Sequence, residues 1–268
     1  MPLIPNDFGT SGFSMETAYY LANASSGSYD PTLDLVSADL GLPAGAGLFT
    51  FGQFFGFTAD VGLGVVLAFR GTASLEDWMT DGRAVQVKSA AYPGQVHSGF
   101  AAALEVIWPG LQPLVPAGRP LFVTGHSLGG ALATLAAVRL LDAGCDVRAV
   151  YTYGSPRVGD LDFYDGYRPM TYRFVNNDDI VPHVPMETLL LAVRPIGFRQ
   201  FSYKHVGTPR YLDRHGQLGE GASDWDSKKD LVFNALIRNR GEPGPRAAED
   251  HRIKNYIAAI ASNLPAEA

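Results

Sequence analysis

The chain has 268 residues, of which 46% are hydrophobic, and a formal net charge of −6 at pH 7. This length and apolar content suit one large core, because single α/β domains of about 250 residues are routine. We therefore expect residues 1–268 to form one domain. The acidic balance, without any block of basic residues, argues against a nucleic-acid partner. The single cysteine, Cys145, cannot form an internal disulfide and is expected to be a buried structural thiol.

The sequence shows neither a secretory signal nor a membrane-spanning segment. Its first residues, MPLIPNDFGTSGF, lack the basic and apolar regions of a signal peptide. The apolar runs at residues 61–69 and 189–193 are as long as core strands and too short to cross a bilayer. These features predict a protein without an integral membrane segment that is cytoplasmic or is exported without a Sec-type signal.

Predicted strands and helices alternate along the chain. The expected strands are residues 45–58 (with a turn), 64–69, 121–123, 149–153, 171–175 and 196–201. The expected helices are residues 15–24, a helix opened by residues 96–100 and continuing to 107, and residues 131–141 and 228–239. In a last helix Ile253, Tyr256, Ile257 and Ile260 share one face. This order predicts an α/β fold with a mostly parallel central sheet and function at the strand C-terminal ends.

The stretch LFVTGHSLGG, residues 121–130, carries the main functional pattern. A strand that turns through Gly-x-Ser-x-Gly into a helix is the nucleophile elbow of an α/β-hydrolase. Gly125 and Gly129 leave room where strand and helix crowd each other, so Ser127 can occupy a strained, exposed turn. The following helix directs N–H groups at the space above Ser127, where negative charge develops in acyl transfer. We predict that Ser127 is the nucleophile; the alternative is an ordinary glycine-rich turn.

A serine nucleophile needs a histidine base and a carboxylate that orients the base. In α/β-hydrolases both follow the serine, the acid before the histidine. Asp178 and Asp179 end the first clear strand after the elbow pair. The carboxylates of Asp160, Asp162 and Asp165 fall in a polar stretch, where we expect a loop and solvation.

The same order rule sorts the histidines. His97 and His126 precede the acid, His183 shares the acid's own loop, and His215 lies in a polar segment typical of the surface. His251 stands directly before the final amphipathic helix, where the rule places the base. His205 follows a possible strand and remains its competitor.

Four blocks of the sequence resemble the class 3 lipases of the filamentous-fungal triacylglycerol lipase type, an α/β-hydrolase family. They are AFRGT with LEDWMTD, VHSGF, VTGHSLGGALA, and YGSPRVGD with RFVNNDDIVPHVP, in the family's order. The similarity runs from about residue 65 to 185 and resumes weakly at residues 203–207 and 251–256. The fungal proteins are secreted and disulfide-bonded, so their localisation does not carry over to this chain.

The resemblance implies roles for individual residues. The family's acid immediately precedes Ile-Val-Pro, which implies Asp179, and its histidine opens a short segment ending in Tyr, which implies His251. It also implies an oxyanion hole formed by the N–H groups of Thr72, after Arg-Gly, and Leu128, after the nucleophile.

The resembling lipases carry a lid at the position of residues 73–95. Leu75, Trp78 and Met79 stand at i, i+3 and i+4, so a short helix there has one apolar stripe. We expect a mobile lid that covers Ser127 in water and opens on a lipid surface; the alternative is a helix docked permanently on the core.

The sequence therefore predicts a serine hydrolase that cleaves carboxylic esters of fatty acids, with acylglycerols as the expected substrates, at a lipid–water interface. No cofactor and no metal are expected. The alternatives with the same triad are a phospholipase, a feruloyl-type esterase and an acyltransferase. A non-catalytic interaction protein with a hydrolase fold is the alternative from a different class.

Overall fold

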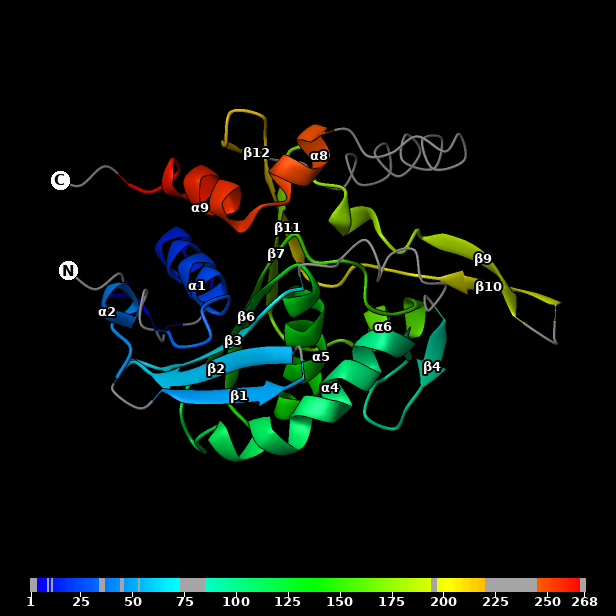
Figure 1. The fold of residues 1–268 in the computed structure, drawn as a ribbon, viewed down its shortest axis with the longest axis horizontal. Coiled ribbons are helices and arrows are strands. Elements are labelled where there is room, and N and C mark those ends of the chain that lie inside the picture. The colour runs from blue at the N-terminus through cyan, green and yellow to red at the C-terminus, as the bar shows by residue number, and fades with distance from the viewer. Residues whose placement is uncertain are drawn as a thin grey trace.

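The computed structural model describes residues 4–8, 10, 12–33, 37–43, 46–52, 54–72, 85–193, 197–219 and 245–265. Its centre is an eight-stranded sheet in the order β1-β2-β3-β6-β7-β8-β11-β12 (Figure 1). The strands are β1 Gly47–Phe51, β2 Phe54–Asp60, β3 Val65–Phe69, β6 Leu121–His126, β7 Val147–Tyr153, β8 Thr171–Asn176, β11 Thr208–Leu212 and β12 Leu218–Gly219. From β3 to β11 neighbouring strands are parallel, and β1, β2 and β12 are antiparallel additions at the edges.

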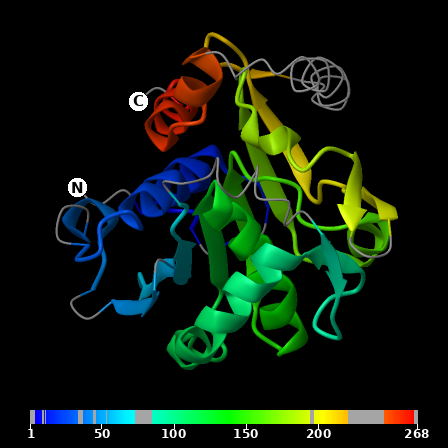
Figure 2. The ribbon, with the colours of Figure 1, turned by 45° about the vertical axis from the view of Figure 1, so that its right-hand side comes forward.

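Helices cover both faces of this sheet. They are α1 Met15–Gly27, α2 Ser37–Leu40, α4 Ser98–Leu111, α5 Leu128–Asp142, α6 Leu161–Gly166, α8 Pro245–Asp250 and α9 Ile253–Ala261. Helices α1 and α9 contact each other on one side of the sheet, and α4 and α5 pack together on the other (Figures 1 and 2). None of the helices in the described ranges is long and apolar enough to cross a membrane.

Strand β3 shows how the two faces are filled. Its side chains alternate: Val65, Leu67 and Phe69 join the core beneath α4 and α5, whereas Val66 and Ala68 join the core beneath α1. All five are buried, as expected of a parallel strand that is covered on both faces. The strand predicted at residues 64–69 is therefore confirmed as a buried interior strand.

The parallel register brings the strand C-terminal ends to one place. Phe69 of β3 pairs with Gly125 of β6, His126 of β6 pairs with Tyr153 of β7, and Tyr153 pairs with Phe174 of β8. The segments that follow these strands consequently meet above the same edge of the sheet, where loops from parallel strands form ligand sites.

Two hairpins lie outside the main sheet. Strand β4 Gln86–Lys88 pairs with β5 Gln95–His97, and β9 Thr188–Val193 pairs with β10 Gly197–Ser202. The strand predicted at residues 196–201 is thus β10, although it extends a hairpin and not the central sheet, as Figure 1 shows. A short apolar run does not distinguish between these two partners.

Three local predictions were wrong. Residues 96–100 do not open a helix as a block: Val96 and His97 end β5, and α4 begins only at Ser98, because the His97 ring accepts the Gly99 and Phe100 N–H groups as an N-cap. The stretch after Asp160 is the helix α6, and Asp160 is a buried N-cap that accepts the Phe163 N–H at 2.9 Å.

Cys145 is half-buried, not buried, because it follows the turn that ends α5. The helix predicted at residues 228–239 lies outside the described residues.

Candidate active site

Ser127 lies in the turn between β6 and α5, with φ 59° and ψ −130°. A non-glycine residue with positive φ is strained, and such strain concentrates at functional sites. The crossing of strand and helix is tight: a Cβ added to Gly125 would lie 2.2 Å from the Gly129 carbonyl oxygen. This geometry is that of the predicted elbow.

The surroundings of Ser127 leave its hydroxyl without a partner. Its N–H donates to the Tyr153 carbonyl at 2.9 Å, which ties the turn to β7. The predicted exposure of Ser127 is wrong, because the side chain is buried against the strand–helix crossing. Within the described part of the chain its Oγ makes no hydrogen bond. A buried hydroxyl that is not engaged structurally is available for chemistry.

Asp179 follows β8 and is completely buried. Its Oδ1 accepts the Val181 N–H at 2.9 Å, and its Oδ2 accepts the Tyr256 hydroxyl at 2.5 Å. Burial raises the pKa of the Asp179 carboxyl, but the neighbouring His251 and these hydrogen bonds outweigh it, so the pKa is lowered overall. Asp179 is therefore held as a carboxylate.

His251 lies between α8 and α9, and its ring faces Asp179. Nδ1 is 3.0 Å from Oδ1 and 2.9 Å from Oδ2 of that carboxylate. Because a carboxylate accepts, Nδ1 carries the proton, and the neutral ring presents a lone pair at Nε2. Nε2 is buried and makes no hydrogen bond to any residue that the structure describes. This is the tautomer that a general base requires.

Gly154, which follows β7, lies against this pair. Its φ is +59°, and an added Cβ would be 2.7 Å from Asp179 Oδ2 and 2.9 Å from His251 Nδ1. The backbone at this position therefore forms the wall on which the acid and the imidazole rest.

Ser127 and His251 do not share a hydrogen bond in the described structure. The ring of His126, the residue before the serine, lies 4.6 Å from the His251 ring, centroid to centroid. In enzymes without substrate, the contact between nucleophile and base is often long and tightens on binding.

The predicted oxyanion donors come from two different elements. Leu128 is the first residue of α5, and Thr72 follows β3 by way of Arg70 and Gly71. A Cβ added to Gly71 would lie 3.2 Å from the Cβ of Ser127, so the segment before Thr72 passes directly beside the serine.

The structure separates the competing candidates. The Pro182 carbonyl accepts a hydrogen bond from His205 Nε2 at 2.5 Å, and burial together with nearby Arg173 and Arg157 lowers the pKa of His205 well below its ordinary value. Asp178 is exposed, unlike Asp179. His215 is exposed, as predicted.

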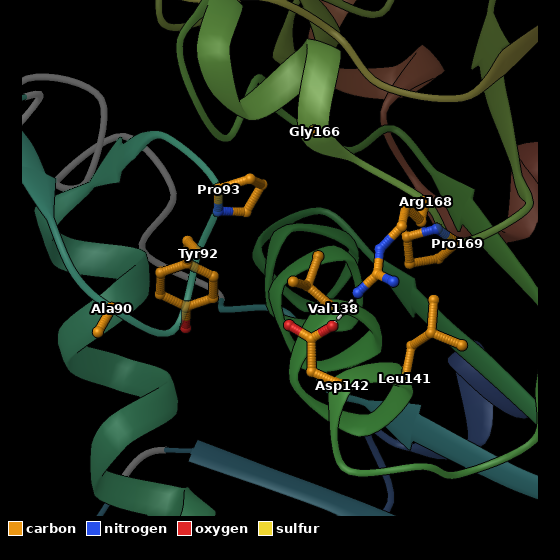
Figure 3. Close-up of a pocket in the computed structure, with 9 residues that line it drawn as sticks. All are labelled: Ala90, Tyr92, Pro93, Val138, Leu141, Asp142, Gly166, Arg168 and Pro169. Carbon is orange, nitrogen blue, oxygen red and sulfur yellow. Dashed lines mark hydrogen bonds and ion pairs between the residues drawn. The ribbon is translucent and has the colours of Figure 1, made fainter.

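A separate pocket of about 200 Å³ lies away from these residues (Figure 3). It is formed by the segment between β4 and β5, the end of α5 and the α6–β8 connection, and an Arg168–Asp142 ion pair spans part of it. Within the described ranges, no group of three or more His, Cys, Asp or Glu side chains could hold a metal ion.

Residues 66–189 match the sequence model of the family described as Lipase (class 3). The match covers less than half of the 268 residues, so it shows that this segment is similar to class 3 lipases. The matched segment includes Ser127, Asp179 and the predicted oxyanion residues, and it ends before His251.

Named relatives show a similar partial match. Secreted mono- and diacylglycerol lipase 1 of Fusarium solani is 36% identical over 56% of this chain and 44% of its own length. A lipase of Rhizomucor miehei is 36% identical over 45% of this chain and 37% of its own. The matched region thus spans less than half the length of these relatives.

Solved structures show the same fold. Lipase II from Rhizopus niveus has a TM-score of 0.59 and 26% identity, covering 74% of this chain and 80% of its own. Together with the mostly parallel sheet, this likeness confirms the predicted α/β-hydrolase fold.

Two parts of the predicted site need separate comment: the lid residues, which fall outside the described ranges, and Tyr256, whose contact with Asp179 was not predicted. Leu75, Trp78 and Met79 of the predicted lid lie outside the described residues. Tyr256 was predicted as a member of an apolar helix face and as the end of the segment that begins at His251, without a role of its own, yet its hydroxyl donates to Asp179. Its recurrence at the end of that segment is the signal that could have indicated this contact.

Proposed function

We propose that this protein hydrolyses carboxylic esters of fatty acids through an acyl-enzyme on Ser127. The observation that carries the proposal is the buried Asp179–His251 pair, whose His251 ring lies 4.6 Å, centroid to centroid, from the ring of His126, the residue before Ser127. Within the described residues, His251 Nε2 and Ser127 Oγ are buried and make no hydrogen bond. The match of residues 66–189 to the Lipase (class 3) model supports the same chemistry.

In the proposed mechanism, His251 Nε2 removes the Ser127 proton while Oγ attacks the ester carbonyl carbon. The carbonyl oxygen becomes an oxyanion that accepts the N–H groups of Leu128 and Thr72. Collapse of this intermediate breaks the carbon–oxygen bond, and the imidazolium returns its proton to the leaving alcohol. Water, deprotonated by the same nitrogen, then attacks the acyl-enzyme and releases the fatty acid. Asp179 remains ionised throughout and stabilises the imidazolium.

We further propose acylglycerols at a lipid–water interface as the substrate class. Support comes from the names of relatives in Fusarium solani and Penicillium camembertii, both described as secreted mono- and diacylglycerol lipases. Phospholipids and feruloylated sugars present the same ester chemistry and serve as comparison substrates.

A fluorophosphonate probe tests the nucleophile directly. We expect the wild type and Ser155→Ala, a buried serine bonded only to the Pro156 carbonyl in the described structure, to be labelled. We expect Ser127→Ala to remain unlabelled and to lose kcat by orders of magnitude while staying folded. Labelling of Ser127→Ala, or no labelling of the wild type, would refute the assignment and favour a non-catalytic role.

The base and the substrate are tested by kinetics. His251→Ala should abolish turnover, whereas His205→Ala should retain it in any preparation that remains folded. Hydrolysis of a p-nitrophenyl ester series beside emulsified triglyceride and phosphatidylcholine identifies the preferred ester. Acyl transfer to an added alcohol in excess over hydrolysis would indicate an acyltransferase instead.

A further inference from the structure

Tyr29 lies just after α1, and its hydroxyl reaches the end of the strand that precedes Ser127. The hydroxyl is 2.8 Å from Nδ1 of His126, the residue before Ser127. The backbone N–H of Gly71 donates to the same hydroxyl. One phenol oxygen therefore contacts both the elbow strand and the segment that leads to Thr72.

His126 continues the connection on its other side. Its Nε2 is 2.6 Å from the His251 carbonyl oxygen, which can only accept, so Nε2 carries a proton. Burial and the neighbouring His251 lower the pKa of His126 to about 3, which keeps the ring neutral. A neutral ring with its proton on Nε2 has an acceptor at Nδ1, so the Tyr29 hydroxyl must donate there.

The directions of these hydrogen bonds define a continuous chain. It runs from the Gly71 N–H to the Tyr29 oxygen, from the Tyr29 hydroxyl to His126 Nδ1, and from His126 Nε2–H to the His251 carbonyl. Because the single proton of Tyr29 is engaged with His126, Tyr29 is not an oxyanion donor.

Tyr29, where this chain of hydrogen bonds is anchored, is held in place by α1 and β6. Helix α1 is tied to β6 by a buried hydrogen bond of 2.8 Å between the Ser25 and Thr124 hydroxyls. Tyr29 follows within one turn of that anchor, and its N–H donates to the Ser26 carbonyl at 3.1 Å. The position of its hydroxyl is therefore fixed relative to the strand that carries Ser127.

We propose that Tyr29 and His126 are positioning residues that hold the His251 backbone and the Gly71–Thr72 segment in register with Ser127. This inference rests on the proposed function, in which those two segments supply the base and an oxyanion donor. Catalytic groups must be held within about 0.5 Å of their productive positions. Hydrogen bonds that fix the His251 backbone and the Gly71–Thr72 segment would therefore support catalysis.

Tyr29→Phe tests the chain with the removal of one oxygen atom. We expect kcat on a soluble p-nitrophenyl ester to fall about tenfold while KM stays within twofold, because positioning acts on the transition state. Tyr20→Phe is the matched control: it removes the buried hydroxyl of a tyrosine in α1, which donates to the Leu40 carbonyl at 2.8 Å. We expect Tyr20→Phe to change stability but to keep kcat within twofold. Equal kcat for wild type and Tyr29→Phe, or an equal loss in both variants, would overturn the proposal.

A second readout does not depend on activity. In ¹⁵N spectra of the histidine rings, the wild-type His126 should carry its proton on Nε2 at neutral pH, and Tyr29→Phe should shift the resonance of its Nδ1. The His126 signals are assigned by their disappearance in His126→Gln. A proton on Nδ1 in the wild type would refute the chain even if Tyr29→Phe failed to fold. If the protein cleaves no ester, the proposed function fails, and these spectra still decide whether the chain exists.

Discussion

Replacement of Gly154 by alanine tests whether the Asp179–His251 contact governs activity. The new Cβ would lie 2.7 Å from Asp179 Oδ2 and 2.9 Å from His251 Nδ1, whereas ordinary van der Waals contact begins at 3.4 Å. One or both groups must therefore move by roughly half an ångström. Asp179 is completely buried and held by Tyr256 and Val181, so His251 is the partner that yields.

The magnitude follows from this displacement. Catalytic groups need placement within about 0.5 Å, and a shift of about 1 Å can reduce the rate about a hundredfold. We expect kcat to fall between about tenfold and a hundredfold, equivalent to about 1.4–2.7 kcal/mol in the barrier. The left-handed backbone of Gly154 adds a stability cost of about 1–2 kcal/mol for any residue with a Cβ.

Gly144→Ala separates the two effects. Gly144 has φ +84° and nothing within 4 Å of an added Cβ, so alanine there adds backbone strain alone. Urea unfolding and p-nitrophenyl ester kinetics should show that both variants lose stability, Gly154→Ala at least as much as Gly144→Ala, and that only Gly154→Ala loses kcat. If Gly154→Ala turns over like Gly144→Ala, the acid–histidine contact does not limit the reaction and the assignment of the pair is wrong.

Three further variants extend the tests. Tyr256→Phe removes the hydroxyl that donates to Asp179 Oδ2. We expect kcat to fall about tenfold and the free energy of unfolding to fall by about 1–3 kcal/mol. An unaltered kcat would show that Tyr256 has a purely apolar role. Burial lowers the pKa of His97 to about 4. Below about pH 6.5 the unfolded chain thus binds a proton there that the folded chain does not, so stability should fall from pH 6.5 toward 4 by about 1.4 kcal/mol per pH unit for this group. His97→Asn keeps an N-cap acceptor and should remove that slope in urea titrations, whereas exposed His215→Asn should not; equal slopes would refute the assignment. Trp78→Ser, in the predicted lid, should reduce turnover of emulsions more than of dissolved esters; an equal effect on both would support the docked helix.

The sequence was most informative where local chemistry dictates local structure. The turn from strand to helix at Ser127 could be predicted because its glycines are needed where the strand and the helix crowd each other. The chain order of acid and histidine, together with the resemblance, selected Asp179 and His251, and these two side chains are hydrogen-bonded in the structure. The parallel sheet followed from alternating strands and helices. Each of these predictions depends on residues close together in the chain or on a rule of topology.

Features that depend on distant partners could not be read in this way. The Tyr29 hydroxyl meets His126 across 97 positions of the chain, and no periodicity or spacing marks that contact. The role of His97 as a cap depends on where β5 ends, and that end is set by its pairing with β4. The partner of β10 depends on a hairpin turn that a run of apolar residues does not reveal.

The contact between α1 and α9 has a consequence for how the protein is made. In the core on that face, Tyr20 and Leu21 from α1 meet Tyr256 and Ile260 from α9, and His251 immediately precedes α9. A ribosome delivers Ser127 and Asp179 well before His251, so in the proposed mechanism a growing chain holds the proposed nucleophile without its base. Ester cleavage would then begin only when the last helix has docked on the first. In the proposed mechanism, the order of synthesis would keep the incomplete chain catalytically inactive.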